Sequence, residues 1–120
     1  SLFGQAPGLD RSRAIKLGES VAGRGKEDAL SLLLFLIETF LARAARLGAT
    51  GQAAPEIVAG EAAALARLSS TPQAARIWAD LQQTLGAKAR HGVAVNLDPS
   101  ALILDMILKI DETAGRIANL

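Results

Sequence analysis

The chain has 120 residues, a formal net charge of +1, no cysteine and one histidine. This length suffices for one domain with a buried core, and the nearly balanced charge excludes a strong electrostatic field for nucleic acid or acidic lipid. Half of the residues are hydrophobic but only 3% are aromatic. Leucine, isoleucine and alanine must therefore fill the core, which is typical of helical bundles.

The N-terminal residues, Ser1-Leu2-Phe3, are neither a signal peptide nor an initiator methionine. We expect residues 1–3 to be the tail of an earlier helix, and residues 1–120 to be a fragment of a longer protein. The longest apolar run, residues 29–37, is shorter than the roughly 20 residues that span a bilayer, so we expect no membrane segment. The absence of cysteine fits a reducing cytoplasm, which is the predicted compartment.

The first predicted helix covers residues 11–22. Asp10 has the side chain of a good N-cap, and Gly23 and Gly25 are suited to end the helix. Gly18 lies inside it and is expected to weaken it by about 1 kcal/mol relative to alanine.

The second predicted helix, residues 26–47, is the longest and is expected to be the central helix, ending before Gly48. Its core stripe at helical spacing consists of Leu30, Leu33, Leu34, Ile37, Leu41 and Ala44. Further apolar side chains occupy other parts of its circumference, namely Leu32, Phe35, Leu36 and Phe40.

A third helix is predicted over residues 56–68 and a fourth over residues 72–90. The segment Ser69-Ser70-Thr71-Pro72 gives the fourth helix a cap and a first-turn proline. Trp78 lies on the apolar stripe of the fourth helix, where a core position is more expected than a binding platform. Gly86 indicates a close helix crossing.

The last predicted helix begins near Pro99, with Asn96 or Asp98 as its N-cap. One apolar stripe contains Ile103, Ile107, Ile110, Ala114 and Ile117. Leu104 and Leu108 form a second stripe beside it. Such a helix needs cover on two sides, one from its own bundle and one available to another subunit. The predicted fold is thus all-α, a single bundle of about five helices.

Catalytic and metal-binding patterns are absent from the sequence. A nucleophilic or zinc site needs more nitrogen and sulfur ligands than His91 alone provides, so we expect His91 to cap carbonyls or to be solvated. Asp105, Asp111 and Glu112 lack the Glu-x-x-His pattern of di-iron bundles and are expected at a solvated edge. We expect no enzyme activity, cofactor, metal or small-molecule ligand.

Two sets of basic residues are candidates for a phosphate site. Residues 23–26 read Gly-Arg-Gly-Lys, but a P-loop follows a strand and ends in Gly-Lys-Ser/Thr, whereas here a helix precedes and Glu27 follows. The basic residues near this turn lack aromatic partners for base stacking, so a solvated face is expected and no direct nucleic-acid contact. They are Arg11, Arg13, Lys16, Arg24 and Lys26.

Three segments resemble the C-terminal helical domain of the bacterial DNA polymerase III delta-prime subunit, in its alphaproteobacterial form. They read Trp78-Ala79-Asp80-Leu81, then Arg90-His91-Gly92-Val93-Ala94-Val95-Asn96-Leu97-Asp98-Pro99, then Leu102-Ile103-Leu104. In that family a Trp-x-x-Leu-like helix leads to an Asn-Leu-Asp turn and a long apolar helix. The similarity is specific over residues 78–110 and loose over residues 48–70.

The resemblance implies a role in the clamp loader, which loads the sliding clamp on primed DNA as part of DNA polymerase III, a DNA-directed DNA polymerase. The N-terminal ATPase-like domains of that family are absent from these residues. The C-terminal domain is then a non-catalytic collar domain that joins the gamma/tau and delta subunits. The resemblance does not assign residues to particular neighbours. We expect the interface on the last helix, at Leu104 and Leu108 especially, with its rim at Arg90, His91, Asn96, Leu97 and Asp98.

Two other functions are compatible with an apolar all-α domain. One is the effector-binding or dimerisation domain of a transcriptional regulator, which needs a pocket with convergent polar groups. The other is a self-associating adaptor. An adaptor dimerises alone, whereas a collar domain needs different neighbours.

Overall fold

The computed structural model describes Gly8, residues 10–50 and residues 61–120, and in these residues the chain forms five helices and no strand. The all-α bundle predicted from the sequence is confirmed. The expected helical tail at residues 1–3 and the expected start of the third helix at residue 56 lie outside the described residues. The helices are α1 (Arg11–Ser20), α2 (Glu27–Thr50), α3 (Glu61–Leu68), α4 (Pro72–Ala94) and α5 (Pro99–Ala118).

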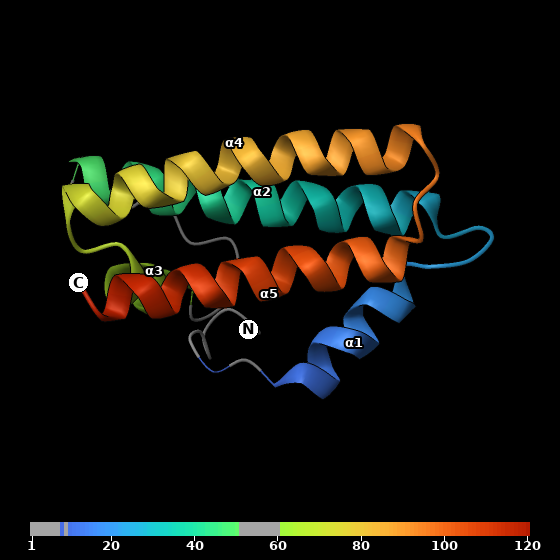
Figure 1. Ribbon diagram of the computed structural model, residues 1–120, viewed down its shortest axis with the longest axis horizontal. Coiled ribbons are helices and arrows are strands. Elements are labelled where there is room, and N and C mark those ends of the chain that lie inside the picture. The colour runs from blue at the N-terminus through green and yellow to red at the C-terminus, as the bar shows by residue number, and fades with distance from the viewer. Residues whose placement is uncertain (1–7, 9, 51–60) are drawn as a thin grey trace.

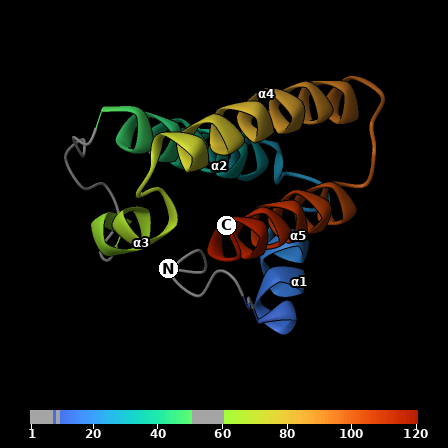
Figure 2. The same ribbon diagram turned by 60° about the vertical axis from the view of Figure 1, so that its left-hand side comes forward.

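The two longest helices, α2 and α4, run antiparallel and form one layer (Figure 1). A second layer contains α5, with α1 packed obliquely against it and α3 near the opposite end of the bundle (Figure 2). The α1–α2 and α4–α5 connections both lie at the same end of the bundle (Figure 1). As predicted for a helix–helix turn, residues 23–26 connect two helices, and Gly23 and Gly25 have positive φ angles of 101° and 75°.

Three helices begin at the side-chain caps that the sequence predicts. The Asp10 carboxylate accepts the Ser12 amide at 2.9 Å, and the Thr71 hydroxyl accepts the Ala74 amide at 3.1 Å. Of the two candidates before α5, Asp98 is the N-cap, and it accepts a bond from the Ser100 amide at 3.2 Å. Each cap satisfies an amide that has no partner inside its own helix.

Two helices extend beyond their predicted ends. The second helix passes through Gly48 to Thr50, whose hydroxyl donates to the Arg46 carbonyl at 2.8 Å. The fourth continues from residue 90 to Ala94, so part of the expected 90–98 connection is helical. A glycine permits a helix end but does not impose one, because its cost of about 1 kcal/mol is easily offset by packing.

The core is centred on Trp78, which is fully buried as predicted. Its indole nitrogen donates to the Leu68 carbonyl at 3.0 Å, and its ring meets Phe40 edge to face with centroids 6.3 Å apart. The sequence predicts Phe40 among the outer apolar residues of the second helix, but its contact with Trp78 buries it. The buried face of α2 is therefore wider than predicted. The α2 stripe predicted as core packs inward, with Ile37, Leu41 and Ala44 almost without exposure.

Close contacts dock α1 and α4 on α5. A Cβ atom on Gly18 would lie 2.8 Å from the Ser100 carbonyl oxygen, and one on Gly92 would lie 3.1 Å from the Leu102 side chain. These glycines let the helices approach more closely than alanine would allow. The fifth helix is thus covered by other helices of its own chain on more than one side, whereas the sequence suggested cover from one side only.

Candidate interaction surfaces

Residues of the α4–α5 turn form hydrogen bonds that cap the end of α4 and the start of α5. The Leu97 amide donates to the Gly92 carbonyl at 2.9 Å and the Asn96 amide donates to the Val93 carbonyl at 3.3 Å. Asn96 has a φ of 57°, a left-handed conformation that asparagine tolerates better than most residues. This pattern is a Schellman motif, followed immediately by the N-cap Asp98. The Asn-Leu-Asp sequence therefore has a direct structural cause.

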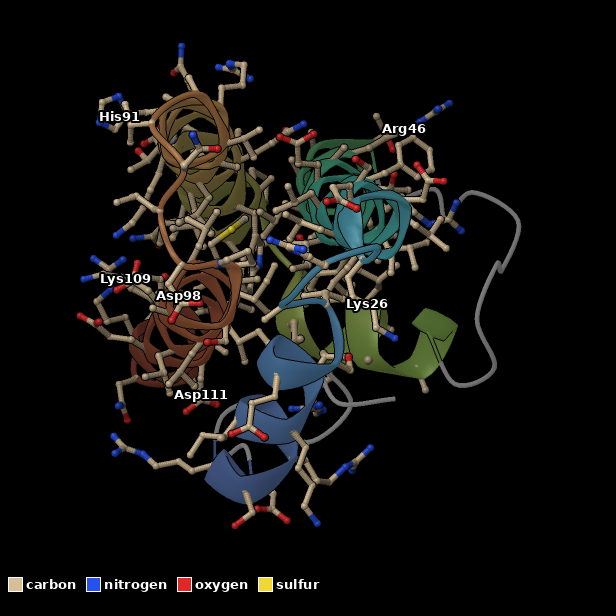
Figure 3. The ribbon with its side chains drawn as sticks, turned by 90° about the vertical axis from the view of Figure 1, so that its right-hand side faces the viewer. Lys26, Arg46, His91, Asp98, Lys109 and Asp111 are labelled. Carbon is tan, nitrogen blue, oxygen red and sulfur yellow. The ribbon has the colours of Figure 1, made fainter. Side chains whose placement is uncertain are left out.

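The same turn exposes apolar side chains. Val93, Val95 and Leu97 are 51%, 50% and 48% exposed, although each is a large hydrophobic residue. Arg90 and His91 lie just before them and are also exposed, and His91 points away from the other helices (Figure 3). The structure thus brings five of the predicted interface residues together at one end of the bundle, and these are Arg90, His91, Asn96, Leu97 and Asp98.

Leu104 and Leu108 are placed differently from these five residues. Both are partly buried, and Leu104 packs against the core. Their contact with a partner stays a prediction. Val93 and Val95 were not singled out from the sequence, although both lie beyond the inner α4 stripe that ends at Ala89 and Gly92. Because neither position continues the spacing of the buried stripe, their exposure could have been predicted from the sequence.

A second apolar surface lies on α2. Leu32, Phe35 and Leu36 are 59%, 61% and 38% exposed. Residues three and four positions apart share a helix face, so these side chains form one surface. The sequence placed them outside the core stripe, and the structure confirms this placement.

Polar side chains between α2 and α4 line a shallow depression of about 380 Å³ that is open to solvent. Its lining includes Glu38, Gln82, Gln83 and Arg90. A Cβ atom on Gly86 would lie 3.2 Å from the Glu38 carboxylate and would meet no backbone atom of α2 closer than 3.9 Å, so the close crossing predicted at Gly86 stays a prediction. Drug-sized ligands usually bind in clefts that bury most of the ligand, and this depression is too open for that.

The acidic residues of α5 contact other parts of the chain. Asp105 forms an ion pair with Lys88 of α4, and Asp111 accepts the Gly8 amide at 2.8 Å. Glu112 lies 3.8 Å from Lys109 on the exposed side of α5. The solvated edge expected from the sequence applies to Glu112, whereas Asp105 links two helices and Asp111 holds the chain before α1.

Basic residues near the α1–α2 turn are all exposed, as expected for a solvated face. In the described ranges, no three or more histidine, aspartate or glutamate side chains are grouped so that they can hold a metal ion. No helix in that part of the chain combines the length and the apolar character needed to cross a bilayer.

Comparison with known proteins gives no relative: no family model, no curated protein and no solved structure matches the chain. The resemblance to the delta-prime collar domain therefore rests on the sequence motifs themselves. The structure adds the location of those motifs on the molecule, which is the α4–α5 turn and the helices that flank it.

Proposed function

We propose that this chain is a non-catalytic assembly domain of the bacterial clamp loader, the collar domain of a delta-prime-like subunit that joins gamma/tau and delta. One observation supports it most: the segment that carries the resemblance, residues 90–98, is also where Val93, Val95 and Leu97 expose apolar side chains. An assembly domain needs such a surface, because burial of apolar area provides the main driving force of association.

The polar and charged residues around this surface suit an interface rim. Arg90, His91, Asn96 and Asp98 are all exposed beside the apolar side chains. An apolar centre with a polar rim is the usual organisation of protein interfaces. The proposed localisation is the cytoplasm, and the proposed partners are protein subunits, with neither nucleic acid nor a small molecule bound directly.

The alternative proposal is a regulatory or adaptor domain. An effector-binding domain needs a pocket that encloses its ligand, and the open depression between α2 and α4 gives it little support. A self-associating adaptor is distinguished by its choice of partner, because it forms homodimers and no mixed complexes.

Light scattering after size exclusion tests the proposal. The chain is run alone and mixed with the C-terminal domains of gamma/tau and delta. A mixed complex that disappears when either partner is omitted supports a collar domain. A stable homodimer with no mixed complex contradicts it and supports the adaptor.

Substitution at the α4–α5 turn locates the interface. Leu97→Asp should reduce formation of the mixed complex by at least tenfold, because it places a charge in an apolar contact while Leu97 is 48% exposed in the free domain. Ile15→Asp is the matched control, since Ile15 on α1 is 43% exposed and lies outside the turn.

Circular dichroism melting should show that both variants remain folded. If Leu97→Asp unfolds the domain, Val93→Asp replaces it, since Val93 is also exposed. Full assembly by a folded variant at either position would place the interface elsewhere.

A further inference from the structure

The outward side of α2 carries a regular stripe that the bundle does not use. Its positions are separated by four, three, four, three and four residues, the spacing of a coiled-coil seam. The residues are Asp28, Leu32, Phe35, Thr39, Ala42 and Arg46. Successive residues advance by about 100° around a helix, so this seam lies opposite the buried stripe that contains Ile37 and Ala44.

The seam is accessible along its length. Asp28, Leu32, Phe35 and Arg46 are exposed, and Thr39 and Ala42 are partly exposed. Arg46 lies on the outer side of α2, away from α4 (Figure 3). Phe35 is 61% exposed and Leu32 59%, which are high values for large apolar side chains inside a helix. Two such side chains one turn apart mark a contact surface rather than scattered exposure.

When two copies of α2 run antiparallel, the residues of one seam complement those of the other in charge and size. In an antiparallel pair of identical helices centred on residue 37, Asp28 of one copy faces Arg46 of the other. In the same register, Leu32 faces Ala42 and Phe35 faces Thr39. Opposite charges thus meet at both ends, and each large apolar side chain meets a small residue. Complementary size is what knobs-into-holes packing requires.

We propose that α2 is a homodimerisation helix, on which a second copy of this chain docks with its own α2 in antiparallel orientation. The contact is isologous, so it closes with two copies and does not propagate. It uses a different helix from the α4–α5 turn and is independent of the proposed collar function. A domain with both surfaces can bind clamp-loader subunits and also pair with itself.

The geometry predicts a dimer of modest affinity. The paired region, residues 28–46, is about 27 Å long at 1.5 Å per residue. Two single helices over this length bury less than the about 1,600 Å² of a standard interface. We therefore expect dissociation in the micromolar range, with a monomer–dimer equilibrium that depends on protein concentration.

Sedimentation equilibrium of the chain from about 1 to 200 µM tests the proposal through charge reversal. Arg46→Glu and Asp28→Lys each place like charges opposite each other at both ends of the seam, and each should weaken dimerisation about tenfold. The double variant restores opposite charges and should regain most of the lost affinity. Restoration is specific to the antiparallel register, because a parallel pair would place each residue opposite itself.

A second pair of variants tests the apolar centre. Phe35→Gln should abolish dimerisation over this concentration range, whereas Val93→Gln, which changes another exposed apolar residue on α4, should leave it unchanged. A chain that stays monomeric at 200 µM overturns the proposal. So does a double charge variant that is no better than the single variants, or a loss of dimer with Val93→Gln that equals the loss with Phe35→Gln.

Discussion

At the scale of single residues, Gly18 allows a close approach between α1 and α5 in the second layer. A Cβ atom there would lie 2.8 Å from the Ser100 carbonyl oxygen and 3.3 Å from its Cα. These are backbone atoms of α5, which cannot rotate away as the end of a side chain can. The helical cost of this glycine is therefore offset by the docking that it permits.

Gly18→Ala should destabilise the domain by about 1–3 kcal/mol, because the overpacking strain exceeds the roughly 1 kcal/mol gained in helix propensity. Chemical denaturation followed by circular dichroism measures this. Gly86→Ala is the matched control. Its Cβ would meet only the ends of the Glu38 and Arg90 side chains, so this change should leave stability unchanged or raise it. Equal gains from both substitutions would contradict the close α1–α5 contact.

Residue types that act locally were predictable, and those that act through distant contacts were not. Asp10 and Thr71 were identifiable as caps because their partners lie two or three residues away. The cost of Gly18 was predictable, but its benefit depends on Ser100, far along the chain. Phe40 was misplaced for the same reason, since its burial depends on Trp78 in another helix.

At the scale of helices, α3 depends on its neighbours. An isolated helix of eight residues is too short to be stable in water. Its C-terminal end is held twice: the Trp78 indole donates to the Leu68 carbonyl, and the buried Ser69 hydroxyl donates to the Ala44 carbonyl of α2. These bonds connect α3 to both helices of the first layer.

Ser69→Ala should lower the free energy of unfolding by about 1 kcal/mol, because it removes the hydroxyl donor of a buried hydrogen bond. Ser70→Ala, at the neighbouring exposed position, should change it by less than about 0.5 kcal/mol. Both values come from denaturation midpoints at constant m-value. A result in which the two substitutions cost the same would mean that the Ser69 bond contributes nothing to stability.

The presence of each helix was predictable from the spacing of its apolar residues. Which of its apolar faces is buried and which is exposed was not. The two-sided apolar character attributed to α5 is satisfied largely inside the chain, by α1 and α4. Among the described helices, α2 instead combines a buried stripe with a strongly exposed apolar side. Periodicity reports that a face is apolar, whereas the docking positions of other helices decide whether it is covered. The candidate interaction surfaces therefore required the structure.

At the scale of the whole molecule, the five described helices differ in how extensively they pack against the others. The α2–α4 pair forms the most extensive contact of the bundle, whereas α1 packs mainly on α5. A helix that packs mainly on one neighbour can separate without exposing most of the core. Local stability should therefore vary across the fold.

Native-state hydrogen exchange should reveal this hierarchy. Central amides of α2 and α4 should exchange only through global unfolding, and those of α1 should exchange through a smaller opening of lower free energy. The dependence on denaturant separates the two cases, because the smaller opening exposes less surface. Identical free energies and identical denaturant dependence in α1 and α4 would instead indicate one cooperative unit.

The first turn of α5 joins parts of the molecule that are far apart in sequence. The Ser100 amide and hydroxyl bond to Asp98 in the α4–α5 turn, while the Ser100 carbonyl lies against the position of Gly18 in α1. Ser100 thus connects the α4–α5 turn to α1 through direct contacts on both sides. We expect a protein bound at Val93 and Leu97 to hold Ser100 in place and so to reduce the mobility of α1, which hydrogen exchange of the α1 amides would measure.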